Sequence, residues 1–475
     1  MTTGLPPAPT GAELRRALAD AAPRPFWLDQ VGAPPHSVPL VTAEETELAV
    51  IGGGFSGLWT ALLAKEREPA RDVILLEGRT IGSAATGRNG GFCAASLTHG
   101  LANGLARFPD EIADLERLGR TNLDEIEATV TRYGIDCDFA RTGELTVALE
   151  PWQVRDLAEY ADLAAPYGGR FEVLDAAGVR AEVNSPAYLG GVWDRDGCAL
   201  VDPARLAWGL RQACLSMGVR IFERSPVRRL EPIPGRLRLH TAHGRLDADQ
   251  VALATGAQTG LLRRLGHYVV PVYDYALVTE PLSAEQLASI GWANRQGIGD
   301  AANQFHYYRL TADQRILWGG YDAVYYAGGR ISAARDQRPQ TFLRLARHFY
   351  DTFPQLSGVR FTHRWGGVID TCSRFCAFYG RAYGGRLAYA VGYTGLGVGA
   401  TRFGARVMLD LLRAEETDLA RLKMVRTRPV PFPPEPLRTG VIQLTRWSIA
   451  RADRRDGRRN LWLRTLDRFG VGFDS

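Results

Sequence analysis

Short apolar runs that end in glycine-rich turns recur along the 475-residue chain. The first run, residues 48–51, stops at three consecutive glycines, and the FSGLWTALLA that follows has the composition of a helix. A second run, Val73–Leu76, ends in Glu77. An apolar strand, a tight turn, a helix and a second apolar strand predict the start of a parallel α/β sheet.

The middle of the chain alternates between helical and strand periodicity. Apolar residues at helical spacing cover 101–135, with Pro109 near a helix start. Residues 137–147 have the pattern of a strand and hairpin, 151–183 carry two helical stretches, and Asp202-Pro203 opens another helix. The pattern predicts helices packed on a sheet.

The last half of the chain is richer in strands. Alternating strands precede an apolar run that ends in Thr255-Gly256, and 265–330 is strand-rich. Residues 337–353 are predicted to be helical, and 385–412 to form a strand, a glycine loop and a helix. Dinucleotide-type segments are thus separated by strand-rich insertions. A nicotinamide domain is usually contiguous, so this interleaving favours a flavin enzyme.

The first glycine turn has the spacing of a dinucleotide-binding turn. Gly52 permits the tight turn, Gly54 admits a pyrophosphate close to the backbone, and Gly57 lets helix and strand pack closely. The helix N-terminus offers N–H groups and positive dipole to the anion. Glu77 follows Gly57 by 20 residues, where a carboxylate binds a ribose 2′-hydroxyl and repels a 2′-phosphate.

Composition is that of an ordinary globular protein, with 45% hydrophobic and 23% charged residues. No apolar run approaches the ~20 residues that span a bilayer. The N-terminal residues carry arginines but no apolar stretch after them, so we expect no signal peptide and a cytoplasmic protein. Residues 1–45 are rich in proline and alanine and are expected to form an extended arm.

Cysteine and charge patterns limit the chemistry further. The six cysteines have no zinc-type spacing, so we expect reduced thiols, no disulfide framework and no metal site.

The net charge of +5 is concentrated in 446–464, which holds seven arginines and two aspartates. A near-neutral remainder argues against nucleic-acid binding. The basic tail is interpreted as a solvated or dimer-facing helix, with an anionic membrane or partner as the alternative.

Seven stretches together resemble the flavin-dependent amine and amino-acid oxidases related to D-amino acid oxidase, glycine oxidase and sarcosine oxidase, and among them the γ-glutamylputrescine oxidase-type members. They are VIGGGFSGLWTALLA, LLEGRTIGSAATGRNGGFC, IDCDFARTGELTVAL, YYRLTADQRILWGG, TFPQLSGVRFTHRWGG, SRFCAFYGR and GYTGLGVGATRFGARVMLDLL. The resemblance implies an α/β fold with an α+β insert, in which a Rossmann-like FAD-binding domain is interleaved with an antiparallel-sheet substrate domain. The expected divisions are an arm at 1–45, an FAD-binding domain at 46–135, 195–260 and 363–412, a substrate domain at 136–194 and 261–362, and a Pro-rich and basic helical extension at 413–475.

The same resemblance implies FAD and the residues that hold it, and we expect the FAD to be non-covalent because Cys372 and Cys376 do not fall on the attachment position of sarcosine oxidase. In such folds ATGRNGG lies along the flavin, where backbone amides bind, and a helix N-terminus near the flavin pyrimidine stabilises its anionic reduced form. The expected cofactor-binding residues are Gly52, Gly54, Phe55, Ser56, Gly57, Glu77, Gly78, Arg79, Ser83, Ala85, Thr86, Gly87, Arg88, Asn89, Gly90, Gly91, Val227, Thr255, Gly256, Gly395, Leu396, Gly397 and Val398.

The chemistry implied is hydride transfer from the neutral amine to flavin N5, followed by imine hydrolysis and reoxidation by O2 to H2O2. Since the cofactor supplies the reactivity, only substrate-positioning groups are expected. Arg374 is a candidate for gripping a carboxylate, or alternatively for an ion pair at the domain interface. His306 and Tyr308 face one side of a predicted strand and Tyr307 the other. Trp365 and Tyr393 are candidate walls of an aromatic pocket, although such aromatics are often core residues.

Three departures from the family pattern affect the functional hypothesis. Leu396 stands where many relatives carry His, and Ala377 near a frequent Pro. Sarcosine oxidase-like enzymes activate oxygen with a lysine beside flavin N5, whereas Lys65 and Lys423 are the chain's two lysines and neither is expected there. An FAD-dependent oxidase of a small-molecule amine is therefore the first hypothesis, and a dehydrogenase with a quinone or protein acceptor the alternative. A non-catalytic flavoprotein is the third hypothesis, and a homodimer is considered.

Overall fold

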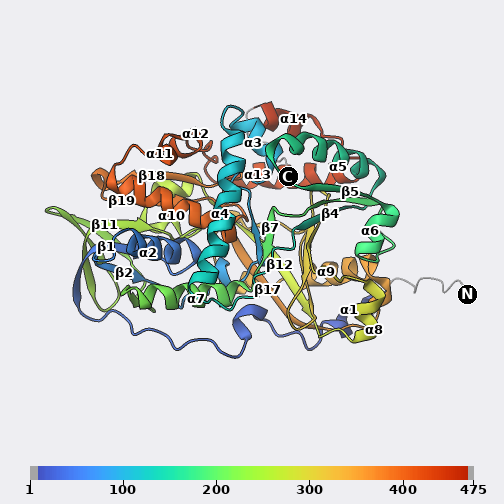
Figure 1. The fold of residues 1–475 in the computed structure, drawn as a ribbon, viewed down its shortest axis with the longest axis horizontal. Helices are drawn as coiled ribbons and strands as arrows, with labels where there is room; N and C mark the ends of the chain where they lie inside the picture. The colour runs from blue at the N-terminus through green and yellow to red at the C-terminus, as the bar shows by residue number, and fades with distance from the viewer. Residues whose placement is uncertain (1–8, 469–475) are drawn as a thin grey trace, which may run out of the picture.

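Two large β-sheets, one mainly parallel and one mainly antiparallel, lie side by side in the computed structural model of the protein (Figure 1). The structure describes residues 9–468. Helices cover the outer faces of both sheets, and the chain passes between the two sheets several times. This arrangement confirms the α/β fold with an antiparallel insert.

The first sheet carries the dinucleotide-type turns. Its strands run in the order β18 (Phe378–Ala382), β19 (Leu387–Val391), β11 (Arg245–Leu253), β1 (Ala43–Ile51), β2 (Val73–Leu76) and β8 (Arg220–Phe222), and β10 (Arg236–His240) and β9 (Arg229–Ile233) fold back from β11. β19, β11, β1, β2 and β8 are parallel to one another. The apolar runs read from the sequence are its central strands, because both faces of the sheet are covered.

The second sheet is assembled from the intervening segments. It orders β16 (Val324–Tyr325), β12 (Val270–Thr279), β15 (Ile316–Gly320), β14 (His306–Leu310), β13 (Gly297–Asp300), β4 (Glu144–Ala148), β6 (Gly190–Asp194) and β5 (Phe171–Asp175), and β17 (Phe361–Thr371) pairs with β12. A short pair, β3 (Phe92–Ala94) and β7 (Cys198–Leu200), links the sheets. The expected division at residue 363 differs from this pairing: residues 363–371 belong to the second sheet, since β17 is hydrogen-bonded along β12.

The two faces of the second sheet have different surroundings. On one face Tyr273, Tyr275 and Leu277 of β12 pack with Phe342 and Phe349 of the helix α9 (Pro339–Thr352). On the other face Ala276, Leu317 and Trp365 pack with Trp27 of the N-terminal arm. The latter face lies toward the first sheet, because Trp27 Nε1 donates to the carbonyl of Asn89 at 2.8 Å.

Helices over the described residues follow the expected periodic segments. Four of them pack together over the first sheet: α2 (Phe55–Arg67), α4 (Ile112–Arg132), α7 (Pro203–Ser216) and α10 (Gly397–Arg413). Besides α9, the others are α1 (Gly11–Ala17), α3 (Leu101–Arg107), α5 (Pro151–Ala164), α6 (Ala176–Glu182), α8 (Ala284–Ile290), α11 (Asp418–Arg421), α12 (Lys423–Arg426), α13 (Leu437–Asp453) and α14 (Leu461–Arg468). No helix in the part of the chain that the structure describes is both long and apolar enough to cross a membrane.

The N-terminal arm is partly helical, where the sequence predicts an extended segment. Thr10 accepts a hydrogen bond from the backbone of Glu13 and the Glu13 side chain binds back to Thr10, so α1 begins with a capping box. From α1 the arm runs along the lower edge of the molecule to β1 (Figure 1). A helix of seven residues is too short to be predicted from residue propensity alone, and the capping box is what stabilises its first turn.

Candidate functional site

The turn after β1 brings backbone segments into direct contact. Gly52 has φ of 112°, which favours glycine, and a Cβ there would collide with the Ala254 carbonyl. A Cβ on Gly57 would collide with the Gly52 carbonyl, so a side chain would push α2 away from the sheet. α2 has no side-chain cap at Gly54. Of its first N–H groups, that of Phe55 donates to Thr86 Oγ1, and the helix N-terminus carries the positive dipole that an anion site uses.

Glu77 lies at the end of β2 beside this turn. Its carboxylate accepts hydrogen bonds from the backbone N–H of Gly53 at 2.6 Å and of Arg79 at 2.7 Å. Burial raises the pKa of this carboxyl, while the two hydrogen bonds lower it. A carboxylate fixed at this place fits the ribose of a dinucleotide.

The glycine-rich segment 85–91 is tied to the first residue of α2. Thr86 Oγ1 accepts a hydrogen bond from Phe55 N at 3.0 Å. The Asn89 side chain donates to the Thr86 carbonyl at 2.7 Å and accepts from Gly91 N at 2.8 Å. Asn89 therefore holds the turn in shape.

Arg88 connects this segment to the second sheet. Its guanidinium forms an ion pair with Asp336 at 2.5 Å and donates to the Gly366 carbonyl at 2.9 Å. In return, Trp365 Nε1 donates to the Arg88 carbonyl at 2.9 Å. Arg88 is thus bound to β17, and Trp365 of β17 is bound to the segment 85–91, so the two residues hold this segment against the second sheet.

A second uncapped helix begins close to the first. α10 starts at Gly397, its N-cap Leu396 makes no side-chain cap bond, and Gly395 before it has φ of 95°. The Tyr393 hydroxyl lies 3.3 Å from Ser56 Oγ at the start of α2. Tyr393 is buried in the core between α2 and α10, so it joins the two helix N-termini.

A buried carboxylate joins the loop before α10 to β17. Asp370 accepts a hydrogen bond from Gly392 N at 2.7 Å, and burial raises its pKa to about 6. Gly256, at the end of the apolar strand β11, has φ of 51° and its Cβ position is 3.9 Å from Asp370 Oδ2. The Thr255-Gly256 turn, the α10 loop and β17 therefore meet at one point.

Side chains on β14 alternate as the strand pattern predicts. His306 and Tyr308 turn toward α9: His306 binds Asp300 at 2.6 Å and His348 at 2.9 Å, and the Tyr308 hydroxyl lies 2.7 Å from that of Tyr188. Burial lowers the pKa of His348 to about 4. These residues form a polar network inside the core, on the face away from the glycine-rich segment.

Tyr307 occupies the face of β14 that points to segment 85–91. Its ring would lie 2.7 Å from a Cβ on Gly90, so only glycine fits beneath it. The Tyr307 hydroxyl donates to Asp274 Oδ2 on β12 at 2.5 Å. Burial raises the pKa of Asp274 to about 6, and the hydrogen bond from Tyr307 opposes the shift. Tyr307 thus lies against the segment 85–91 and holds the Asp274 carboxyl on β12 by a hydrogen bond.

Arg374 has a different environment from the one expected of a substrate grip. Its guanidinium donates to the carbonyls of Cys376 at 3.2 Å, Thr427 at 3.0 Å and Met424 at 2.9 Å, and to that of Ala377. All these acceptors are backbone groups, so neither a carboxylate nor the expected ion pair is its partner here. Arg374 anchors α12 to the turn after β17.

Asp274 is the residue that sequence reasoning missed. It lies within VPVYDYALVT, where alternation puts it on one face with Val272 and Ala276. A carboxylate in the middle of an apolar strand was the available signal, since such a group must find a partner. Its partner, Tyr307, is brought close only by the folding of distant strands.

The two lysines lie away from this face. Lys65 Nζ donates to the carbonyls of Pro69 at 2.5 Å and Arg71 at 2.9 Å, and Lys423 is exposed at the start of α12.

Cys372 is buried, donates to the carbonyls of Cys376 and Gly392, and has its pKa raised by burial to about 11. The remaining expected cofactor contacts, among them Gly78, Ser83 and Val227, stay predictions.

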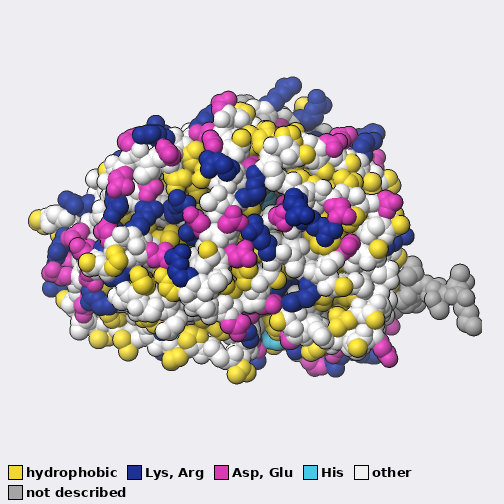
Figure 2. Space-filling model, in the orientation of Figure 1, with side chains coloured by type: hydrophobic (Ala, Val, Ile, Leu, Met, Phe, Trp, Pro, Cys, Tyr) yellow, Lys and Arg dark blue, Asp and Glu magenta, His cyan; other side chains and the backbone are white. Residues whose placement is uncertain are grey.

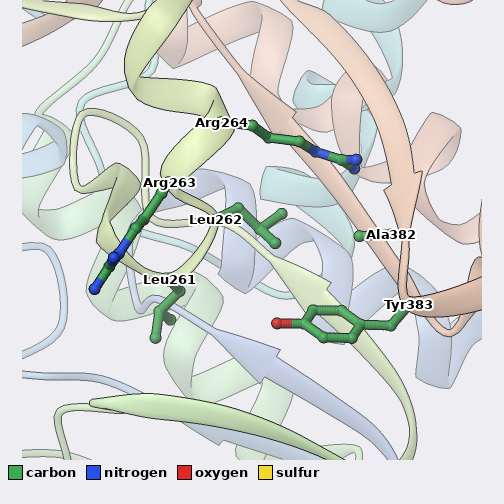
Figure 3. Close-up of a pocket in the computed structure, with 6 residues that line it drawn as sticks. All are labelled: Leu261, Leu262, Arg263, Arg264, Ala382 and Tyr383. Carbon is green, nitrogen blue, oxygen red and sulfur yellow. The ribbon is translucent and has the colours of Figure 1, made fainter.

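A surface depression of about 340 Å³ lies elsewhere on the first sheet (Figure 3). Its walls come from the turn after β11 and from the β18–β19 hairpin: Leu261, Leu262, Arg263, Arg264, Ala382 and Tyr383. None of these residues is an expected cofactor or substrate contact. The depression is therefore no part of the candidate site.

The glycine turn, Glu77, the segment 85–91 and the uncapped α10 together form a dinucleotide cradle that faces an antiparallel sheet. A family model described as "FAD dependent oxidoreductase" (DAO) matches residues 47–411. The chain belongs to this family. The cradle residues fit its cofactor, FAD, because two helix N-termini and the Glu77 carboxylate converge on glycine backbone.

The chain is similar to several known proteins in sequence or in structure. Gamma-glutamylputrescine oxidoreductase of Escherichia coli K12 is 34% identical over 387 residues, 78% of this chain and 84% of that protein. Glycine oxidase from Geobacillus kaustophilus has a TM-score of 0.66 at 20% identity and covers 81% of this chain and 99% of its own. L-proline dehydrogenase from P. horikoshii has a TM-score of 0.65 at 18% identity and covers 79% and 96%. These two structures support the fold.

Proposed function

We propose that this FAD-dependent oxidoreductase deaminates a primary or secondary amine oxidatively. The glycine turn, Glu77 and the segment 85–91 would hold FAD, which would supply a hydride acceptor for the α-hydrogen at flavin N5 and pass the two electrons to O2 to give H2O2. Water would hydrolyse the imine product. The observation that carries the proposal is the Asp274–Tyr307 pair, whose tyrosine ring faces Gly90 of the cofactor segment.

The pair supplies what an amine needs before it can be oxidised. An alkylamine is protonated at neutral pH, whereas only the neutral nitrogen has a lone pair to assist loss of the α-hydrogen. With a pKa raised to about 6, the Asp274 carboxyl is ionised at pH 7 and more basic than an ordinary aspartate. It attracts the ammonium group and accepts its proton at Oδ2, the atom that Tyr307 holds.

The other proposed substrate-positioning residues act at a distance from this pair. Trp365 and Arg88 hold the segment 85–91 against the second sheet, and Tyr393 fixes the two helix N-termini. His306 and Tyr308 support β14 from the core side, which keeps Tyr307 in place. We therefore propose them as positioning residues rather than as groups that touch the substrate.

Two electron acceptors are proposed for the second half of the reaction. O2 is proposed first, as in oxidases of this kind. The placement of Lys65 and Lys423 favours the second candidate, a dehydrogenase with a quinone or protein acceptor, because no lysine is near Tyr307 in the described part of the chain. We further propose a cytoplasmic protein with non-covalent FAD. The homodimer stays a prediction.

Anaerobic titration of the FAD-loaded protein, followed by air, tests the proposal. The similarity to gamma-glutamylputrescine oxidoreductase makes γ-glutamylputrescine the first amine to test, alongside simple amines and amino acids. Bleaching of the flavin band with rapid recovery and peroxide in air supports the oxidase, and slow recovery supports the dehydrogenase. A flavin that no amine or amino acid bleaches would favour the non-catalytic flavoprotein.

A further inference from the structure

The C-terminal helices expose apolar and basic side chains together. On α13 and α14, Leu437 is 65% exposed, Leu444 42%, Trp447 52% and Leu461 80%. Arginines surround them, and along the upper edge of Figure 2, where Figure 1 places α14, basic side chains project beside hydrophobic ones. We define the tail surface as Leu437, Leu444, Trp447, Leu461, Arg451, Arg454, Arg455, Arg458 and Arg464.

The spacing of the apolar residues on α13 gives them one face. Leu437, Leu444 and Trp447 are separated by seven and three residues, which places them on one side of a helix. A different side of α13 carries Ile449 and Ala452, which pack with Leu463 and Trp462 of α14. α13 therefore keeps a second apolar stripe in water, beyond the one needed for folding.

The arginines of the tail surface form no ion pair with any residue that the structure describes. Among residues 9–468, Arg451, Arg454, Arg455, Arg458 and Arg464 take part in none of the ion pairs, and Arg451 stacks over Trp447 at 5.4 Å. The nearby Asp456 is exposed and also unpaired. The cluster consequently retains a strong positive charge.

Exposed arginines on the first sheet are of two kinds. Arg220 pairs with Glu44 at 2.8 Å and with Asp72 at 2.7 Å, whereas Arg228, Arg245 and Arg263 form no ion pair with a described residue. Unpaired arginines are therefore not special to the tail surface. What distinguishes it is the combination of arginines with exposed apolar side chains, because all the exposed leucines and tryptophans among the described residues except Leu163 lie on it.

We propose that the tail surface docks this protein on an anionic lipid bilayer. Burial in the acyl–headgroup boundary stabilises leucine and tryptophan side chains, and lipid phosphates attract arginines. A second copy of the chain is a poor occupant, because an isologous contact would bring two such positive clusters together. Nucleic acid would satisfy the arginines but leave the leucines in water.

Docking would fix the orientation of the whole protein, because the tail is bound firmly to the second sheet. Gln443 donates to the Tyr325 carbonyl at 3.4 Å, and the Tyr325 hydroxyl donates to Glu435 at 2.5 Å. At the other end of α13, Asp453 accepts hydrogen bonds from Asn303 and Gln304 at 2.6 and 3.1 Å. The tail lies beyond residues 47–411 that match the family, so the docking is a property of this chain and independent of the reaction proposed above.

Vesicle sedimentation with the full-length, FAD-loaded protein tests the docking. We expect the protein to pellet with phosphatidylcholine vesicles that contain 30% phosphatidylglycerol, and to stay in solution with pure phosphatidylcholine or in 0.5 M salt. Replacing Arg454, Arg455 and Arg458 by Gln should weaken binding about a hundredfold, since each arginine near the surface contributes about fivefold. Trp447→Ser should weaken it further.

A charge-matched variant separates the tail from general electrostatics. Arg228, Arg245 and Arg263 are exposed on the first sheet, and their triple Gln variant loses the same charge. It should bind vesicles like the wild type, and melting temperature and flavin absorbance should be unchanged in both triple variants. Equal binding by the two triple variants would overturn the proposal. So would no binding to anionic vesicles, or a dimer that Trp447→Ser dissociates.

Discussion

Tyr307 on β14 donates a hydrogen bond to Asp274 on β12, although strand β15 lies between them. The intervening residue is Gly319, which pairs with Tyr307 on one side and with Ala276 on the other. A Cβ on Gly319 would lie 2.5 Å from the Tyr307 ring. The missing side chain therefore lets the tyrosine lie across β15 and reach the carboxylate.

Asp274 should set the acid limb of the pH profile. Below a pKa of about 6 the carboxyl is protonated and cannot accept the substrate proton, so kcat/KM should fall as pH drops through 6. Asp274→Asn should remove this limb and lower kcat/KM by roughly 10²–10⁴-fold. Tyr307→Phe deletes a hydrogen bond that lowers the pKa of Asp274, so the limb should move to higher pH.

Tyr308→Phe is the matched control for these variants. Tyr308 is the next residue on β14, but its hydroxyl contacts Tyr188 on the opposite face. Its loss should leave the acid limb where it is. A limb that moves equally in both phenylalanine variants, or that persists in Asp274→Asn, would exclude Asp274 as the titrating group. Flavin absorbance at each pH checks that the cofactor stays bound.

Gly319→Ala should disturb the Tyr307–Asp274 hydrogen bond although neither of these two residues is replaced. The added methyl would displace the Tyr307 ring, at a cost of about 1–3 kcal/mol in the free energy of unfolding. The acid limb should move to higher pH, as in Tyr307→Phe. Gly260→Ala is the control, since a Cβ there meets no atom within 4 Å. Unchanged stability and pH profile in Gly319→Ala would show that the tyrosine reaches Asp274 by another path.

The cofactor half of the molecule was readable from the sequence because its signals are local. The turn at Gly52 and Gly57, the strand at Val73–Leu76 and Glu77 lie within one βαβ unit, and the structure has each element where it was predicted. The interleaved fold followed from the family resemblance. Local signals also gave the alternation of β14 correctly.

The substrate face could not be read in the same way. Choosing His306 and Tyr308 over Tyr307 required knowing which face of β14 meets the first sheet, and α9 decides that from 40 residues away. Arg374 resembled a ligand-binding arginine, but its acceptors at Met424 and Thr427 belong to a later segment. Alternation tells which residues share a face, and only tertiary packing tells what that face contacts.

Gly57→Ala should abolish FAD binding. A methyl at this position collides with the Gly52 carbonyl, so α2 must move and the pyrophosphate loses the helix N-terminus. The purified variant should be colourless, with no flavin absorbance, whereas Gly440→Ala, in open space on α13, should be yellow. Retention of FAD by Gly57→Ala would mean that the cofactor is bound without this turn.

Arg374→Lys separates a structural role from substrate binding. The guanidinium satisfies buried carbonyls at several directions, which one ammonium group cannot do, so the free energy of unfolding should fall by about 1–3 kcal/mol. KM should stay within twofold for amines with and without a carboxylate, and the exposed Arg381→Lys should change neither quantity. A tenfold rise in KM confined to carboxylate-bearing substrates would instead show that Arg374 leaves its carbonyls to grip the substrate, since only a direct contact distinguishes the two amines.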